Sequence, residues 1–362
     1  MTNRERVLKI LSGEPPDRVP WFADLDYWYS AHKRAGTLPD EYQGDGYFSM
    51  NRENGAGFYL QGYFPFKEIP EGVTYETQTQ GHRILRAMKT PEGDLTEITQ
   101  YLPASSSTGF VKHFVETEED LPAFQYYINS LHFEEDYIEA RRRKDLIGDN
   151  GVVLCYTPRS PFMQMLTTFA GVEALFMMLA DIPEKVNEVL SRLEKKYDEA
   201  ARLAVNSPAE LIMIPENLSG EVAGGYYKTY LRPYESKWIA EIQKAGKKSL
   251  IHVDGTLRGI LQKVAETGFN VIEAVTPAPV GDMTMEEAAR AAPGTILWGG
   301  LPGLMFTPHV SEDAFIRHVR SVLAVMKTEP RFVLGAADQV PPDGMMERVK
   351  AVPALCEEFG KY

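Results

Sequence analysis

The stretch Ser249-Leu250-Ile251-His252-Val253-Asp254-Gly255 is a short apolar run that ends in an imidazole and a carboxylate. Its length and its β-branched residues favour a buried strand over a helix. Similar runs recur on both sides of it, at residues 19–22, 152–156, 211–214, 270–274, 295–298 and 331–334. Most of them are apolar throughout, as expected of parallel strands that are buried on both faces. The sequence therefore predicts the parallel sheet of an α/β protein.

Longer helical patterns separate these runs. Apolar residues recur at three- and four-residue spacing over residues 183–205, 227–245, 256–267, 285–291, 311–327 and 344–359, with Ser311 as an N-cap. Seven strands with right-handed crossovers close into a (β/α)8 TIM barrel if an eighth strand lies near residues 57–61. A doubly wound sheet would need a glycine-rich phosphate turn after its first strand, and the chain has no G-x-G-x-x-G motif. We therefore expect the barrel.

Residues 62–149 break the alternation of strands and helices. They carry alternating polar and apolar stretches at residues 74–79 and 82–88, and a turn at Pro91-Glu92-Gly93-Asp94. This pattern predicts an antiparallel β-hairpin with flanking helices, inserted as an excursion from a distorted barrel. Because the insertion is poor in core-forming apolar runs, residues 1–362 are expected to form a single domain.

Composition limits where the protein works and what it binds. The 362 residues are 44% hydrophobic, and no apolar run approaches the ~18 residues of a membrane span. The amino terminus lacks the apolar core of a secretory signal, so a cytoplasmic location is expected. A formal net charge of -13 disfavours nucleic acids and anionic membranes as partners. Cys155 and Cys356 are interpreted as core residues, because two cysteines make no disulfide framework.

Polar residues gather where the predicted strands end, which is where a barrel of this type carries its chemistry. Glu216, His252, Asp254, Glu273 and Asp338 lie at or near the ends of four strands. Carboxylates in one cavity repel unless a cation or shared protons compensate them. A divalent metal is the simplest compensation, and zinc accepts nitrogen and oxygen ligands. Glu216, His252, Asp254 and Asp338 are thus candidate metal ligands, and the first three are also candidate catalytic residues.

Each of these residues also has a structural interpretation. Asp254 and Asp338 could cap the turn or helix that follows them. Glu273 is better interpreted as a packing residue or as one that supports a ligand from behind. His252 could be a satisfied core histidine, although its place at a strand end favours function.

Motifs along nearly the whole chain resemble those of one superfamily. Residues 4–8 (RERVL) and 15–21 (PPDRVPW) look like the opening of the uroporphyrinogen decarboxylase superfamily. Further matching segments lie at residues 89–93, 114–121, 251–255, 277–282 and 335–343. The resemblance implies a distorted (β/α)8 barrel with one of two chemistries. These are metal-free decarboxylation, or zinc-dependent methyl transfer that serves corrinoid proteins.

Two departures from the superfamily patterns bear on this choice. Where true decarboxylases carry the arginine-rich segment M-R-Q-A-G-R, residues 22–28 read FADLDYW, and these acids would repel a polycarboxylated tetrapyrrole. The methyltransferase branch has H-x-C near the fifth strand and a further cysteine near the last strand. Here residues 252–254 read HVD and residues 336–338 read AAD. Oxygen ligands in place of thiolates make the metal a stronger Lewis acid, suited to an ether or phenolic oxygen.

These observations predict a zinc-dependent methyltransferase, resembling the corrinoid-dependent branch, that catalyses O-demethylation. It would move a methyl group between an O-methyl or similar small donor and a corrinoid protein that carries cobalamin. Two alternatives stay open: a metal-independent decarboxylase or lyase acting on a small carboxylated substrate, and a non-catalytic binding protein. A homodimer is also left open. The substrate pocket is expected to include Tyr27, Trp28, Tyr63 and Glu273, with Tyr59, Phe64 and Tyr226 as further aromatic candidates.

Overall fold

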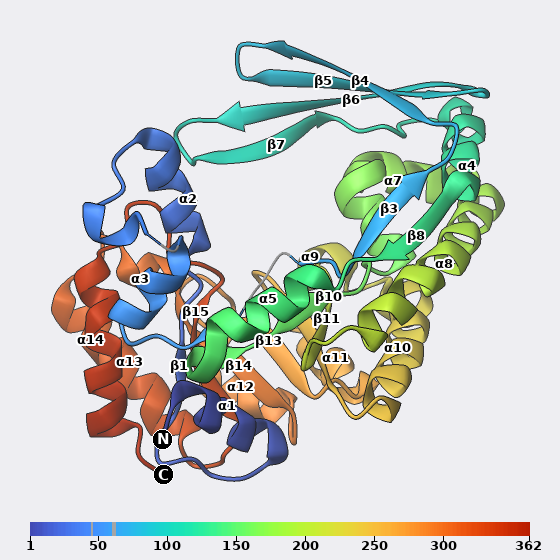
Figure 1. The fold of residues 1–362 in the computed structure, drawn as a ribbon. Helices are drawn as coiled ribbons and strands as arrows, with labels where there is room; N and C mark the ends of the chain where they lie inside the picture. The colour runs from blue at the N-terminus through green and yellow to red at the C-terminus, as the bar shows by residue number, and fades with distance from the viewer. Residues whose placement is uncertain (45, 60–62) are drawn as a thin grey trace.

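Parallel strands form the centre of the molecule. In the computed structural model, which describes residues 1–44, 46–59 and 63–362, seven strands pair in parallel in the order β1-β15-β14-β13-β12-β11-β10 (Figure 1). Their bounds are Trp21–Phe22 (β1), Leu154–Tyr156 (β10), Leu211–Leu218 (β11), Lys248–Val253 (β12), Val271–Val275 (β13), Ile296–Pro302 (β14) and Phe332–Ala337 (β15). This sheet confirms the parallel α/β architecture that the apolar runs predict.

Helices cover the outside of the sheet. They are α1 (Asn3–Ser12), α2 (Asp26–Ala35), α3 (Tyr47–Glu53), α6 (Pro161–Gln164), α7 (Gly171–Asp181), α8 (Pro183–Asn206), α9 (Gly220–Ala223), α10 (Arg232–Lys244), α11 (Leu261–Thr267), α12 (Met285–Ala291), α13 (Glu312–Met326) and α14 (Met346–Phe359). Two π-helical segments, Met165–Phe169 and Tyr227–Leu231, precede α7 and α10. The side chain of Ser311 accepts from the amide of Ala314, which confirms the predicted N-cap of α13.

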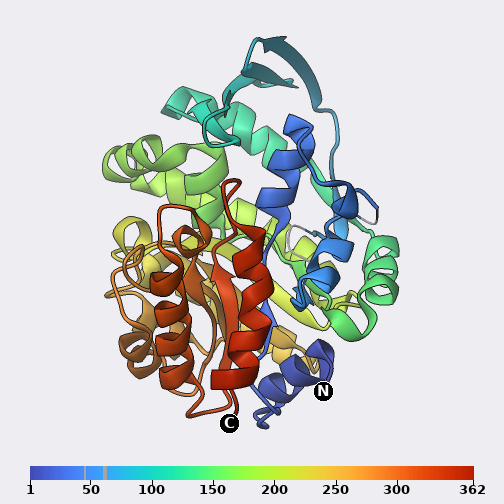
Figure 2. The same ribbon diagram turned by 90° about the vertical axis from the view of Figure 1, so that its left-hand side faces the viewer.

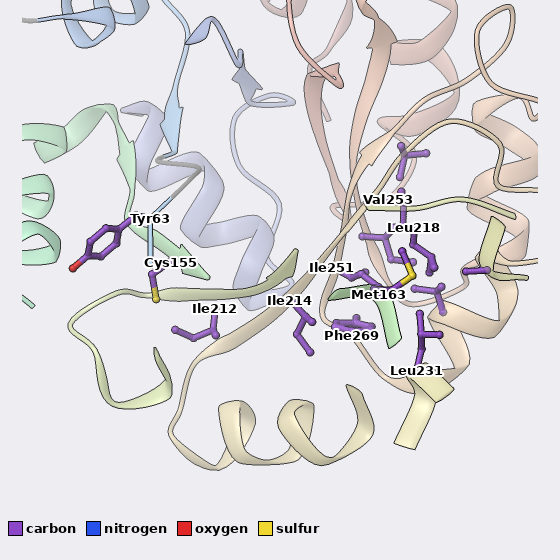
Figure 3. Close-up of a cluster of buried hydrophobic side chains, with 14 of the residues drawn as sticks. Tyr63, Cys155, Met163, Ile212, Ile214, Leu218, Leu231, Ile251, Val253 and Phe269 are labelled. Carbon is purple, nitrogen blue, oxygen red and sulfur yellow. The ribbon is translucent and has the colours of Figure 1, made fainter. Parts of the chain in front are cut away.

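Alternate residues of the strands bury two different cores. Met213 and Leu250 belong to one buried cluster with Trp298, and α1 packs against it through Ile10. The residues between them point toward the helices, as Figure 3 shows for Ile212 and Ile214 of β11 and for Ile251 and Val253 of β12. Two buried faces explain why the strands read as continuous apolar runs.

Short parallel pairings lie between the two edge strands, β1 and β10. Phe22 forms a parallel bridge with Gly57, and β2 (Phe58–Tyr59) pairs in parallel with β9 (Gly151–Val152). β9 precedes β10 directly along the chain. These pairings occupy the place of the expected eighth strand, of which residues 60 and 61 lie outside the described residues.

The insertion is larger than the single hairpin expected from its sequence. It contains an antiparallel pair and a four-stranded antiparallel sheet, β3 (Phe66–Pro70) with β8 (Leu131–Glu135), and β4 (Thr74–Gln80), β5 (Arg83–Thr90), β6 (Gly93–Leu102) and β7 (Ser107–Lys112). The expected helices are present as α4 (Leu121–Ser130) and α5 (Ile138–Ile147). Strands such as β4 are strongly polar, so the pattern of apolar residues did not predict this sheet. It lies at the end of the molecule opposite both termini (Figures 1 and 2).

One expected helix begins later than its sequence pattern indicates. The pattern starts at residue 256, but α11 begins at Leu261. The carboxylate of Asp282 accepts from the amides of Leu257 and Arg258 in the intervening turn. Asp254 is therefore not the N-cap of this helix. Among the described residues, no helix has the length and apolarity needed to cross a membrane.

Candidate active site

A buried imidazole and a buried carboxylate meet at the carboxyl ends of β12 and β13. His252 and Glu273 are register partners on these strands, so their side chains emerge side by side from the same sheet face. His252 Nδ1 lies 2.6 Å from Glu273 Oε2, and Tyr59 donates to Glu273 Oε1 at 2.8 Å. Glu273 is fully buried, and His252 is only 6% exposed. Glu273 thereby holds the Nδ1 edge of the imidazole, and Tyr59 holds Glu273.

The other imidazole nitrogen faces Asp338, which directly follows β15. His252 Nε2 lies 3.8 Å from Asp338 Oδ1, beyond hydrogen-bond distance. Asp338 Oδ1 is buried and has no hydrogen-bond partner among the described residues. A capping carboxylate would accept from a nearby backbone amide, and no such bond is formed by Oδ1. The geometry therefore favours a functional interpretation of Asp338 over a capping one.

Asp24 is a further buried carboxylate at this site, which the sequence interpretation did not select. It lies two residues after β1. Its Oδ1 accepts from Asp26 N at 3.0 Å, and its Oδ2 accepts from Gln339 Nε2 at 3.0 Å. The bond from Gln339 ties Asp24 to the residue that follows Asp338. The rule of inspecting residues just after each strand, applied to β1, would have found it.

Negative charge dominates this cluster, which we define as Asp24, His252, Asp254, Glu273 and Asp338. Burial alone lowers the pKa of His252, but Glu273, Asp338 and Asp254 raise it to about 9. Burial and the charge of Asp338 raise the pKa of Asp24 to about 7. Burial also raises the pKa of Asp338, to about 6, although the charge of His252 opposes the shift. The cluster therefore favours any added positive charge, whether a proton or a cation.

A backbone irregularity accompanies the site at β13. The register between β13 and β14 shifts between Glu273 and Val275, and Ala274 has a φ of 62°. The facing Gly299 allows this approach, because a Cβ there would lie 2.5 Å from the carbonyl oxygen of Val275. Such bulges recur next to active sites, where they re-aim a side chain.

Glu216, which the sequence groups with His252 and Asp338, has hydrogen-bond partners of its own. It lies in a bulged part of β11, fully buried, and accepts from both the amide and the hydroxyl of Ser160 at 3.0 Å. Burial raises its pKa to about 7, while Ser160 and Arg159 lower it. Neither His252 nor Asp338 contributes to that shift. The sequence alone could not exclude Glu216, because only the bulge decides which way its side chain points.

Asp254 lies at the mouth of the site rather than inside it. Its amide donates to the carbonyl of Leu218 at 2.9 Å, and the residue is exposed to solvent. Its charge raises the pKa of both His252 and Asp338, so it lies within electrostatic reach of them.

The expected pocket residues have separate positions. Glu273 belongs to the cluster, as does its partner Tyr59. Trp28 is buried and donates to the carbonyl of Gly344 at 2.9 Å. Tyr63 donates to the carbonyl of Asp136 and packs in the core. Tyr27, on α2, donates to the carbonyl of Ser105 in the β6–β7 turn. These three aromatic rings therefore have structural partners.

Two donor atoms converge in the cluster. His252 Nε2 and Asp338 Oδ1 face each other, and Glu273 on the far side of the ring matches the carboxylate that orients a metal-bound histidine. Within the described part of the chain, no group of three or more His, Cys, Asp or Glu side chains is arranged to hold a metal ion.

Residues 143–359 match the family model of uroporphyrinogen decarboxylase (URO-D). Curated relatives are the uroporphyrinogen decarboxylases of Trichodesmium erythraeum, 24% identical over 92 residues, and of Parasynechococcus marenigrum, 23% identical over 145 residues. These matches cover 25% and 38% of the chain, and 26% and 40% of the relatives' own lengths. The chain therefore spans well under two thirds of the curated relatives it matches.

A solved structure, a methyltransferase from Methanosarcina mazei, superposes with a TM-score of 0.62 at 14% sequence identity. The superposition covers 99% of both chains, so the two proteins share a fold over their whole length.

Proposed function

The chain belongs to the uroporphyrinogen decarboxylase family, and from this premise we propose that it is a zinc-dependent methyltransferase. It would move a methyl group between a small O-methyl donor and a corrinoid protein that carries cobalamin. The observation that carries the proposal is the buried, unpartnered Asp338 Oδ1 facing His252 Nε2, with Glu273 behind the imidazole. Anionic side chains around one imidazole form a site that a divalent cation stabilises.

The residues present fit such an ion in part. His252 Nε2 and Asp338 would be two ligands, and Asp254 at the mouth would be the third, which completes the usual protein set of a catalytic zinc. Glu216 has no part in this set, because it is engaged by Ser160. When bound, the metal would supply Lewis-acid polarisation of the donor's ether oxygen.

The chain's own residues would prepare this site. Glu273 holds the Nδ1 side of His252, so Nε2 is the nitrogen that would become a ligand when a bound metal replaces its proton. Tyr59 in turn holds Glu273. Asp24 is anchored by Gln339 and carries a pKa raised to about 7, so it can hold a proton near neutral pH.

The proposal takes the sheet as a closed (β/α)8 barrel. The parallel bridge from Phe22 to Gly57 and the β2–β9 pair support closure, since they lie between β1 and β10. Tyr59 of β2 also shares one buried cluster with Leu154 of β10 and Trp298 of β14. A closed barrel would direct the ends of β12, β13 and β15 into one mouth.

The test is metal content and methyl transfer on the same preparation. We expect about one equivalent of zinc per chain in freshly purified protein. We also expect zinc-dependent methylation of cob(I)alamin by an aryl methyl ether, with cobalamin standing in for the partner protein. Protein without bound metal, and without methyl transfer when zinc is added back, would contradict the proposal.

A metal-free decarboxylase or lyase acting on a small carboxylated compound is the second candidate. It is favoured by the donor set, because the described residues bring two ligands close together and not three. Decarboxylation of such a compound by metal-stripped protein would support it. Binding of small molecules without any turnover would instead indicate a non-catalytic binding protein.

A further inference from the structure

Arg159 is a cation at the same end of the sheet as the acidic cluster, and it forms no ion pair with a described residue. It lies three residues after β10, in the loop that leads to α6. Its guanidinium donates to Asn217 Oδ1 at 3.2 Å, and its Nε is buried without a hydrogen-bond partner. Its charge lowers the pKa of Glu216, yet no carboxylate among the described residues lies within ion-pair distance of it. An arginine without a carboxylate partner can bind an external anion through its outer guanidinium nitrogens.

Asn217 strengthens this interpretation. It lies in the bulge of β11 with a φ of 53°, a left-handed conformation that is uncommon outside glycine. Its side chain is exposed, and its Oδ1 accepts from Arg159. Its amide NH2 donates to no other described residue, so it remains available beside the guanidinium. Strained residues of this kind cluster at ligand-binding sites.

The arginine and the acidic cluster lie at the same end of neighbouring strands. Arg159 follows β10, Asn217 lies on β11, and His252 lies on β12, the next strand in the sheet. Two strand spacings separate β10 from β12, roughly 10 Å. A single aromatic ring with substituents at opposite positions has about this reach. This edge of the sheet therefore carries a cation after β10 and the acidic cluster around the end of β12.

We propose that Arg159 and Asn217 bind a carboxylate of the substrate. This proposal rests on the proposed function. It specifies the methyl donor as a small aromatic methyl ether that carries a single carboxylate. The carboxylate would accept from the outer guanidinium nitrogens of Arg159 and from Asn217 Nδ2, and the ether oxygen would lie at His252 and Asp338. One unpaired arginine compensates one negative charge, while Asp24, Glu273 and Asp338 repel any further charge at the other end. The arrangement selects a monocarboxylate over a polycarboxylate.

The test is binding measured by calorimetry with the three methoxybenzoate isomers and with the corresponding methoxybenzamides as uncharged isosteres. Wild-type protein should bind at least one benzoate more tightly than its amide. Arg159→Ala should weaken that benzoate about ten- to hundredfold, as expected for a lost charge-assisted pair, and leave the amide unchanged. Arg159→Lys keeps the charge but not the guanidinium fork, so its affinity for the benzoate should lie between those of wild type and Arg159→Ala.

Arg258→Ala is the matched control, because Arg258 is an exposed arginine on the loop after β12 that is already paired with Glu287. It should leave both affinities unchanged. Equal losses for benzoate and amide in Arg159→Ala, an unchanged benzoate affinity, or no binding of any probe by the wild type would overturn the proposal. Circular dichroism of each variant shows that the fold is retained, and Arg159→Lys serves if Arg159→Ala does not fold.

Binding is measured both with zinc and after chelation, without methyl transfer. Benzoate preference that persists in protein lacking metal and activity would leave the carboxylate subsite standing while the proposed function fails. Zinc-dependent methyl transfer that is unchanged in Arg159→Ala would support the proposed function and contradict the carboxylate subsite.

Discussion

His252 Nε2 lies 3.8 Å from Asp338 Oδ1, across a gap that no described residue fills with a hydrogen bond. The opposite nitrogen of the same ring is held at 2.6 Å by Glu273. One side of the imidazole is thus fixed, and the other is open toward a carboxylate. This asymmetry is what distinguishes the site from a histidine that is merely satisfied in the core.

His252→Ala should remove most of the bound zinc, because it deletes the nitrogen ligand and leaves the carboxylates less well compensated. Metal analysis after gel filtration measures the change. Glu216→Gln is the matched control: it removes a buried carboxylate outside the cluster and should leave metal content as in the wild type. Equal zinc content in His252→Ala and wild type would rule out His252 as a ligand.

Asp338→Asn separates ligation from capping. A cap tolerates this exchange within a few tenths of a kcal/mol, roughly, because Asn caps about as well as Asp. A ligand needs the negative charge, so we expect weaker zinc binding and turnover reduced by at least ~10²-fold, with the fold retained. Thermal unfolding of the metal-free protein is measured beside zinc affinity. The exposed Asp343→Asn is the control, and unchanged affinity and activity in Asp338→Asn would return Asp338 to a structural role.

Uroporphyrinogen should not be decarboxylated by this protein. The segment after β1 offers Asp24 and Asp26 where true decarboxylases carry arginines, so a polycarboxylated substrate meets like charge. Incubation with uroporphyrinogen and chromatography of the oxidised products measures the outcome. Coproporphyrinogen formed at an ordinary enzymatic rate would show that the acidic segment does not exclude the substrate.

Asp24→Asn should change how stability depends on pH in metal-free protein. The folded-state pKa of Asp24 is raised from 3.8 to about 7, so its contribution to stability is complete below pH 3.8 and is lost as pH rises through 7. At pH 8 the variant should therefore have a free energy of unfolding higher than that of wild type by on the order of a few kcal/mol, and so a higher unfolding temperature, with little gain near pH 4. Asn has one acceptor oxygen in place of two, so the variant keeps only one of the bonds from Asp26 N and Gln339 Nε2.

Thermal midpoints of chelated protein across pH 4–9 test this expectation. Asp40→Asn, at an exposed residue, is the control and should give the wild-type profile. A stabilisation by Asp24→Asn that is the same at pH 4 and pH 8 would mean that the charge of Asp24 is not its cause.

The sequence by itself determined the parallel sheet, most helix positions and the family. Strands buried on both faces are apolar throughout, so runs such as residues 249–253 can be predicted as strands from the sequence alone. The family motifs lie on the same elements. Residues at strand ends were also accessible, and His252, Glu273 and Asp338 meet as their positions predict, since parallel strands carry their carboxyl ends to one edge.

Only the tertiary structure decided which strand-end residues lie together. Glu216 and His252 both lie near strand ends, yet the strand is bulged at Glu216 and both oxygens of that carboxylate accept from Ser160, whereas His252 contacts Glu273. Asp24 joins the site because Gln339, distant in sequence, donates to it. The position of a strand follows from local sequence patterns. The direction in which one of its side chains points depends on a local register shift and on contacts with residues distant in the sequence.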